Sequence, residues 1–198
     1  MAESEGTFSK GRLEAFSDGV IAVIITVMVL ELKAPASAAP ADLLKLWPAF
    51  LIYVVSFTFV AVYWINHHSL IGQARAATAT LIWANNFLLL WLSLIPFATA
   101  YVAETDLAPF PTMVYGAVQF LCGGAFALTG RTIRAQRKDE PDFLRAAQAH
   151  GRKDIAAQAT YVAAIIVAAF SPVAAVLMFI AVAAAYVVPD LFGDAAKG

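Results

Sequence analysis

The sequence predicts an all-α integral membrane protein with six transmembrane helices. Of its 198 residues, 61% are hydrophobic, and the mean hydropathy of +0.74 lies well above that of an ordinary soluble protein. Several long stretches lack Asp, Glu, Lys and Arg, and each is long enough for a helix to cross the hydrocarbon core of a bilayer. Residues 1–198 are therefore expected to form a single six-span domain.

The first expected span, residues 12–33, is the least regular. Only residues 19–30 are uncharged, a length that suits the core of a signal peptide, and the small residues of "APASAAPA" resemble a cleavage site. Because Glu14 and Asp18 lie where a signal peptide has basic residues, we favour a retained helix. Such a helix can cross if its charged ends face protein or water.

Five further spans are expected from the uncharged stretches. They are residues 46–68, 76–103, 107–130, 154–170 and 172–189. Pro96 predicts a kink within residues 76–103. The apolar stretch after residue 154 would make a helix of roughly 50 Å, too long for one crossing, so Ser171 and Pro172 are expected to divide it at a tight turn.

The positions of Lys and Arg predict that both termini are cytoplasmic. The segment after the fourth span contains most of the basic residues, namely Arg131, Arg134, Arg137, Lys138, Arg145, Arg152 and Lys153. Basic loops stay on the cytoplasmic side, and this rule explains the segment, although a patch for anionic lipids or regulation is an alternative. Within it, "EPDFLRAAQAH" predicts a short separate helix that begins near Pro141.

Several classes of function are not expected. The net charge of −1 and the absence of a basic tract argue against a nucleic-acid partner. Cys122 is the only cysteine, so neither an internal disulfide nor a cysteine metal cluster can form. The sequence has no HExxH, GxSxG or phosphate-loop motif, so we expect no enzyme activity and no cofactor.

The first span has two different faces when it is drawn as a helix. One stripe holds Arg12, Phe16, Gly19, Val23, Thr26, Val27 and Leu30, and the opposite side holds Ser17, Asp18, Ile21, Ile25, Met28 and Leu32. Arg12 and Asp18 are six residues apart and so do not pair along the helix. The charged residues of the first span therefore need partners from other spans.

A polar network between helices is the expected partner, because buried polar groups in a membrane must be hydrogen-bonded. Its expected members are Arg12, Phe16, Ser17, Asp18, Trp64, Asn66, His67 and His68, with Ser69, Trp83, Asn85 and Asn86 as further candidates. A metal site or acid–base pair formed by Asp18 with His67 and His68 is less favoured. Adjacent histidines on a helix point about 100° apart and do not easily share one ion.

Three motifs lie at the ends of the first two spans: "RLEAFSDGV" at the start of the first span, "VLELKAP" at its end and "YWINHHSL" at the end of the second. They resemble the transmembrane protein 175 family, which includes the lysosomal potassium channel and its prokaryotic homologues. The number of spans and the length are similar to the prokaryotic branch. The resemblance implies a multi-pass protein of a prokaryotic inner membrane.

The resemblance also implies a potassium-permeable cation channel that consists of four copies around a central pore lined by the first helix. The animal proteins carry two units per chain, and since this sequence shows no internal repeat, a homotetramer is implied. There is no TVGYG filter. The implied constriction and selectivity residues are Val23 and Leu30, with Thr26 and Val27 between them, and Val23 is smaller than the Ile or Leu that homologues often have.

Two other functions stay open from the residues alone. A proton-coupled transporter would use Asp18 with His67 or His68 as a proton relay. A structural membrane-assembly protein without transport would use the small-residue faces of "CGGAFA" and "AAIIVAAF" for helix packing.

Overall fold

A computed structural model describes residues 9–35 and 37–192, with the side chains of residues 148–150 and 188–192 left undescribed. Its elements are helices, in the order α1 (Lys10–Leu30), α2 (Pro40–Lys45), α3 (Trp47–Gly72), α4 (Ala79–Leu92), α5 (Ile95–Glu104), α6 (Pro109–Gln136), α7 (Pro141–Ala168) and α8 (Pro172–Phe192). The all-α expectation is therefore confirmed for the described residues.

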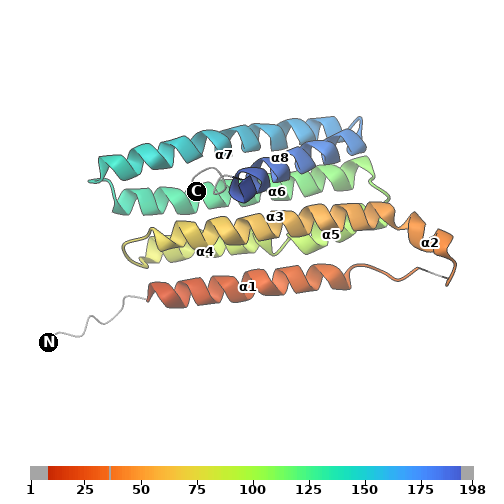
Figure 1. Ribbon diagram of the computed structural model, residues 1–198, viewed down its shortest axis with the longest axis horizontal. Coiled ribbons are helices and arrows are strands. Elements are labelled where there is room, and N and C mark those ends of the chain that lie inside the picture. Colours follow the sequence, from red (N-terminus) through yellow and green to blue (C-terminus); the bar gives the residue numbers. More distant parts are fainter. Residues whose placement is uncertain (1–8, 36, 193–198) are drawn as a thin grey trace.

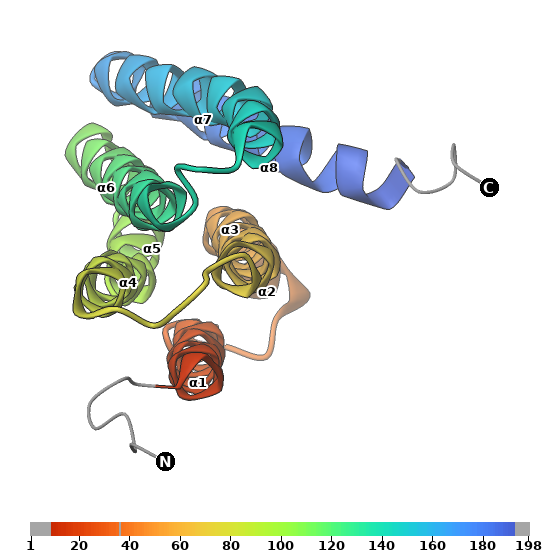
Figure 2. The ribbon, with the colours of Figure 1, turned by 90° about the vertical axis from the view of Figure 1, so that its left-hand side faces the viewer.

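The helices form an elongated bundle (Figure 1). The long helices run lengthwise, α5 continues the direction of α4, and the short α2 lies beyond one end. Viewed from the end, α1 lies at one edge of the bundle and the α7–α8 pair at the opposite edge, with α3, α4, α5 and α6 between them (Figure 2). Helix α1 contacts α3, α4 and α5, and it thus has neighbours on one side only.

Within the described residues, four helical units are long and apolar enough to cross a membrane: Lys10–Leu30, Trp47–Gly72, Ala79–Glu104 and Pro109–Gln136. This confirms a membrane protein. The last two expected spans, residues 154–170 and 172–189, fall on the second half of α7 and on α8. The apolar helix Pro172–Val187 is shorter than the four units, and α7 carries charges through its first half, so these two crossings stay predictions.

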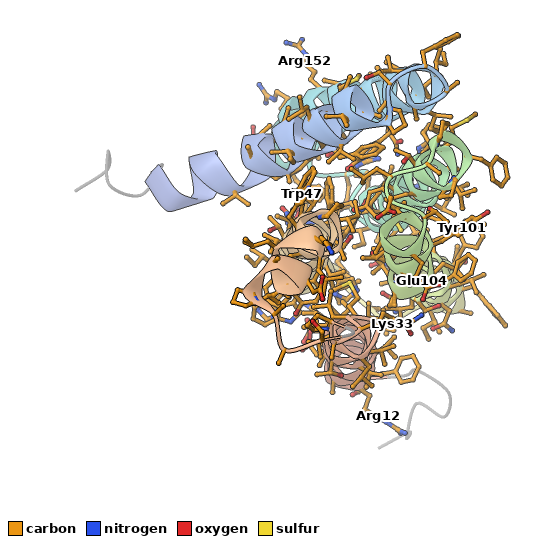
Figure 3. The ribbon with its side chains drawn as sticks, turned by 90° about the vertical axis from the view of Figure 1, so that its right-hand side faces the viewer. Arg12, Lys33, Trp47, Tyr101, Glu104 and Arg152 are labelled. Carbon is orange, nitrogen blue, oxygen red and sulfur yellow. The ribbon has the colours of Figure 1, made fainter. Side chains whose placement is uncertain are left out.

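Helix α1 ends earlier than the sequence suggests. The Ser9 hydroxyl caps its start by accepting from the Arg12 backbone N–H at 3.2 Å. Its end is at Leu30 rather than residue 33, where the Glu31 N–H bonds back to the carbonyls of Met28 and Val29. Pro35 cannot extend the helix, and the chain turns towards α5, where Lys33 forms an ion pair with Glu104 (Figure 3).

The expectation of a separate short helix near Pro141 is wrong. Helix α7 does begin at Pro141, but it continues without a break to Ala168, since no proline interrupts it and a single Gly151 is tolerated. The expected kink near Pro96 is confirmed. The helix stops at Leu92 and resumes at Ile95, because Pro96 has no N–H to continue the hydrogen-bond ladder.

A continuous core joins α1 to the rest of the bundle. At its centre the Tyr115 and Phe179 rings lie 5.2 Å apart, centroid to centroid, where α6 meets α8. Gly116 permits this approach, because a Cβ there would lie 3.1 Å from Phe179 and 2.8 Å from Ile165. At the edge of the same core, Ile21 and Met28 of α1 are buried. Helix α1 is thus held by one face only.

Candidate functional site

The candidate site is the face of α1 that the bundle leaves uncovered. The buried face of α1 consists of Leu13, Ser17, Ile21, Ile24 and Met28. This spacing of three and four residues is that of one helical face. In Figure 2 no other described helix lies on the opposite side of α1, beyond the edge of the bundle.

All four of the expected constriction residues lie on the uncovered face. Val23 is 58% exposed, Val27 36% and Leu30 78%, and Thr26 is also exposed. From Val23 to Leu30 is about 10 Å along the helix. Exposed apolar patches of this kind usually contact another molecule or lipid, and here they would do so along the middle and end of α1.

The Thr26 hydroxyl has a defined direction of donation. It donates to the carbonyl of Val23 in its own helix at 2.9 Å. Because the proton is used in this bond, the lone pairs of the oxygen are what Thr26 can offer to a group outside the helix. A cation is the kind of group that such an oxygen can bind.

On the buried side, a chain of polar side chains links α1 to α3 and α4. The Asn85 amide donates to the Ser17 hydroxyl at 2.9 Å, and the Ser17 hydroxyl donates to the Leu13 carbonyl at 2.8 Å. Asn85 Oδ1 lies 2.7 Å from His67 Nε2 and accepts its proton. All three side chains are buried, so each has its partner away from water.

Asp18 is bonded separately, at the edge of the same region. Its carboxylate accepts a hydrogen bond of 3.0 Å from the Trp64 indole of α3. No bond between Asp18 and a histidine is present among the described residues. The indole bond and the Ser17–Asn85–His67 chain together fix the N-terminal half of α1 against α3 and α4.

The other expected network residues are placed elsewhere. The Asn66 amide donates to the Val62 carbonyl of its own helix at 2.8 Å, and His68 is exposed. Phe16 is 57% exposed on the uncovered face. Arg12 is exposed and points away from the bundle (Figure 3).

A second buried polar cluster was not anticipated from the sequence. The Thr99 hydroxyl of α5 lies 2.7 Å from the Ser56 hydroxyl of α3, which lies 3.0 Å from the Tyr115 hydroxyl of α6. The Gln119 amide donates to Tyr115 at 2.9 Å. Its members are single polar residues in apolar spans, and this pattern in the sequence could have predicted that they are hydrogen-bonded to one another. The cluster links three helices behind α1.

Ion pairs tie the ends of the helices together. In the loop between α3 and α4, Arg75 bonds to Asp139 at 3.0 Å and to Glu140 at 2.5 Å, both in the turn before α7. Arg137 also bonds to Glu140, and these two guanidiniums, Arg137 first, hold the pKa of Glu140 below its usual 4.5. We call these four residues the loop clamp. Next to it, Lys10 of α1 donates to the Gly72 carbonyl.

No metal centre is evident within the described ranges, which hold no group of three His, Cys, Asp or Glu side chains suited to an ion. Cys122 is buried and unpaired with another cysteine. From Val23 to Leu30, the chemistry available to the uncovered face of α1 is that of apolar side chains and the Thr26 hydroxyl.

Comparison with known proteins identifies the family. A family model described as "Endosomal/lysosomal potassium channel TMEM175" matches residues 12–96. A potassium channel of Chryseobacterium sp. (strain P1-3) is 38% identical over 182 residues, covering 92% of this chain and 94% of that one. An endosomal/lysosomal proton channel TMEM175 of Mus musculus is 34% identical over 102 residues, or 20% of its own length.

A solved structure has the same fold. A crystal structure of a lysosomal potassium-selective channel TMEM175 homologue from Chamaesiphon minutus superimposes with a TM-score of 0.81 and 26% identity, covering 90% of this chain and 96% of that one. The match with the Chryseobacterium protein extends over nearly the whole of both chains. The chain is a multi-pass membrane protein, not an enzyme, and it belongs to the TMEM175 family of channels.

Proposed function

We propose that this protein is a potassium-permeable channel in which four copies surround a pore lined by α1. The observation that carries the proposal is the uncovered face of α1 from Val23 to Leu30. It is apolar apart from Thr26, lies at the edge of the bundle and follows the family's "RLEAFSDGV" motif. The bacterial relatives named as potassium channels support the choice of ion.

In this proposal the chain crosses the membrane six times, with residues 1–198 as one unit and both termini cytoplasmic. The basic residues around the α6–α7 turn support this orientation. The second half of α7 and α8 make the last two crossings, and the bacterial relatives support placement in a prokaryotic inner membrane. Lys10 and the loop clamp then lie at the cytoplasmic end.

The proposed constriction consists of Val23 and Leu30 from each copy. Rings of apolar side chains gate a pore by expelling water, because an ion that loses its hydration shell without replacement meets a large barrier. Leu30 is the more exposed of the two, at 78% against 58% for Val23, and its side chain is one carbon longer. We therefore assign Leu30 the larger part of the closed barrier.

Thr26 and Val27 lie between these rings and contribute the selective step. Four Thr26 oxygens, each with its proton bonded to its own helix, present lone pairs that replace part of the lost hydration. Potassium holds its water less tightly than sodium does, so a weakly coordinating ring penalises sodium more. The Ser17–Asn85–His67 chain and the Asp18–Trp64 bond keep the helix in place for this task.

The test is cation flux into liposomes that contain the purified protein. Potassium entry should exceed sodium entry, and Leu30→Ala should increase flux and alter their ratio. Leu177→Ala is the matched control, because Leu177 is 61% exposed on α8, at the opposite edge from α1. Equal flux in wild type and Leu30→Ala would remove the constriction from α1.

Protons are a second candidate permeant ion. The mammalian relatives named as proton channels support it, although their match covers 46% of this chain. The alternative of a proton-coupled transporter with an Asp18–histidine relay has less support, since Asp18 bonds to Trp64 and His67 to Asn85. A pH-sensitive dye inside the same liposomes would detect proton entry, and dependence of potassium flux on a pH gradient would favour the transporter.

A further inference from the structure

A groove of about 190 Å³ lies between α7 and α8, at the edge of the bundle farthest from α1. Ala156 and Ala157 of α7 and Ala181 and Ala185 of α8 line it, and all except the partly buried Ala157 are exposed. Small side chains on both helices leave the space that larger ones would fill. The groove is therefore an apolar trough that opens onto the surface.

One end of the groove has a cationic side chain in its wall. Lys153 lines this end, and its ammonium lies 4.1 Å from the centre of the Tyr186 ring. The neighbouring Asp154 accepts a hydrogen bond of 2.9 Å from the Tyr186 hydroxyl. Arg152 is exposed and points away from the bundle (Figure 3). Among the described residues that line this end, Lys153 is the one cation, and its ammonium is the group that can donate to an anion.

The groove begins where α7 changes from charged to apolar. Arg152, Lys153 and Asp154 are adjacent, and residues 155–168 of α7 contain no charged residue. From Lys153 to Thr160, the groove extends about 10 Å along α7 into the apolar half. A cation at the boundary and an apolar trough beyond it match a lipid's charged headgroup and the first part of its acyl chain.

We propose that the α7–α8 groove binds an anionic phospholipid, with the lipid phosphate at Lys153 and an acyl chain between the alanines. The volume equals that of roughly six water molecules in the liquid, which suits part of one chain rather than a whole lipid. The proposal rests on the proposed function in one respect: with α1 at the pore axis, the α7–α8 pair faces the bilayer.

Lipid binding is measured by native mass spectrometry of the purified protein in detergent, with added dioleoylphosphatidylglycerol or dioleoylphosphatidylcholine. Phosphatidylglycerol should bind more tightly. Lys153→Gln should weaken phosphatidylglycerol binding about fivefold, the effect of one cation near an anionic headgroup. It should weaken phosphatidylcholine binding less, because the choline ammonium offsets the charge of the phosphate. Lys138→Gln, which removes an exposed cation from the turn before α7, is the matched charge control and should change neither.

The trough is tested by filling it. Ala181→Leu should weaken both lipids, whereas Ala163→Leu, at an exposed position of α7 outside the groove, should weaken neither. The proposed site would be overturned if Lys138→Gln lowered the affinity for phosphatidylglycerol as much as Lys153→Gln does. It would also be overturned if Ala181→Leu left the affinity for both lipids unchanged. A change in subunit number with Ala181→Leu would show that a second copy covers the groove. Since no ion flux enters these measurements, their outcome is separate from that of the conduction assay.

Discussion

Thr26 is the only hydroxyl among the four proposed pore residues, and it gives the sharpest test at the residue scale. Thr26→Val keeps the shape and removes the oxygen. The potassium-to-sodium permeability ratio should fall about fivefold, the effect of losing an interaction of about 1 kcal/mol. Reversal potentials under bi-ionic conditions measure this ratio.

Thr58→Val is the control for Thr26. Thr58 also donates to a carbonyl of its own helix, that of Val54 at 2.8 Å, but it lies on α3. It should keep the wild-type ratio. If Thr26→Val kept it as well, the selective step would have to lie elsewhere on the path.

Variants of Asp18 and its partner Trp64 test whether Asp18 anchors α1 or relays protons. Asp18→Asn keeps an oxygen that can accept from the Trp64 indole, so stability and flux should stay near wild type. Trp64→Phe removes the donor, and it should lower the free energy of unfolding by about 1 kcal/mol, since the bond is partly exposed. Thermal unfolding in detergent measures the difference. Loss of flux in an intact Asp18→Asn oligomer would instead identify a relay.

At the scale of single helices, the sequence predicts the two faces of α1 well. Residues placed opposite the stripe, such as Ser17, Ile21 and Met28, are buried, and the residues of the stripe are exposed. The reason is physical: 3.6 residues per turn fix which side chains share a face, whatever the partner is. The sequence does not predict which residue of another helix bonds to a given side chain of α1. Asn85 was one of several polar candidates, and only tertiary packing distinguishes it from Asn86.

Helix ends and helix continuity were harder to predict. After the end of α1, Lys33 pairs with Glu104, a contact across 71 residues of sequence that no local pattern predicts. Helix α7 combines a charged half and an apolar half without a break, so composition suggested two elements where one exists. Ser56, Thr99 and Tyr115 lie far apart in the chain and form a cluster only because α3, α5 and α6 meet.

At the scale of the whole molecule, the loop clamp makes stability depend on pH. The arginines lower the pKa of Glu140 in the folded state. The stabilisation that the ionised Glu140 carboxylate gives the fold is therefore fully present above the ordinary pKa of 4.5, and it is lost as the pH falls through the lowered pKa. Wild type should therefore unfold at a higher temperature than Glu140→Gln at neutral pH, and the two should converge under acidic conditions.

Asp142→Asn is the control for the loop clamp. Asp142 pairs with Arg145 within a single turn of α7, so its loss should change the unfolding temperature less. A difference between wild type and Glu140→Gln that stayed constant with pH would show that the ionised carboxylate is not what holds the loop.

In the proposed four-copy assembly, the uncovered face of α1 contacts α1 of the other copies. With α1 at a central axis, Leu30 side chains from different copies lie close together, whereas Leu177 on α8 faces outward. In a Cys122→Ala background, which removes the only native cysteine, Leu30→Cys should form covalent dimers with a short bismaleimide and Leu177→Cys should not. One cysteine per chain joins only pairs, so native mass spectrometry must supply the expected count of four. Four copies without cross-linking at Leu30 would place α1 against lipid, and the pore would then have to be lined by another helix.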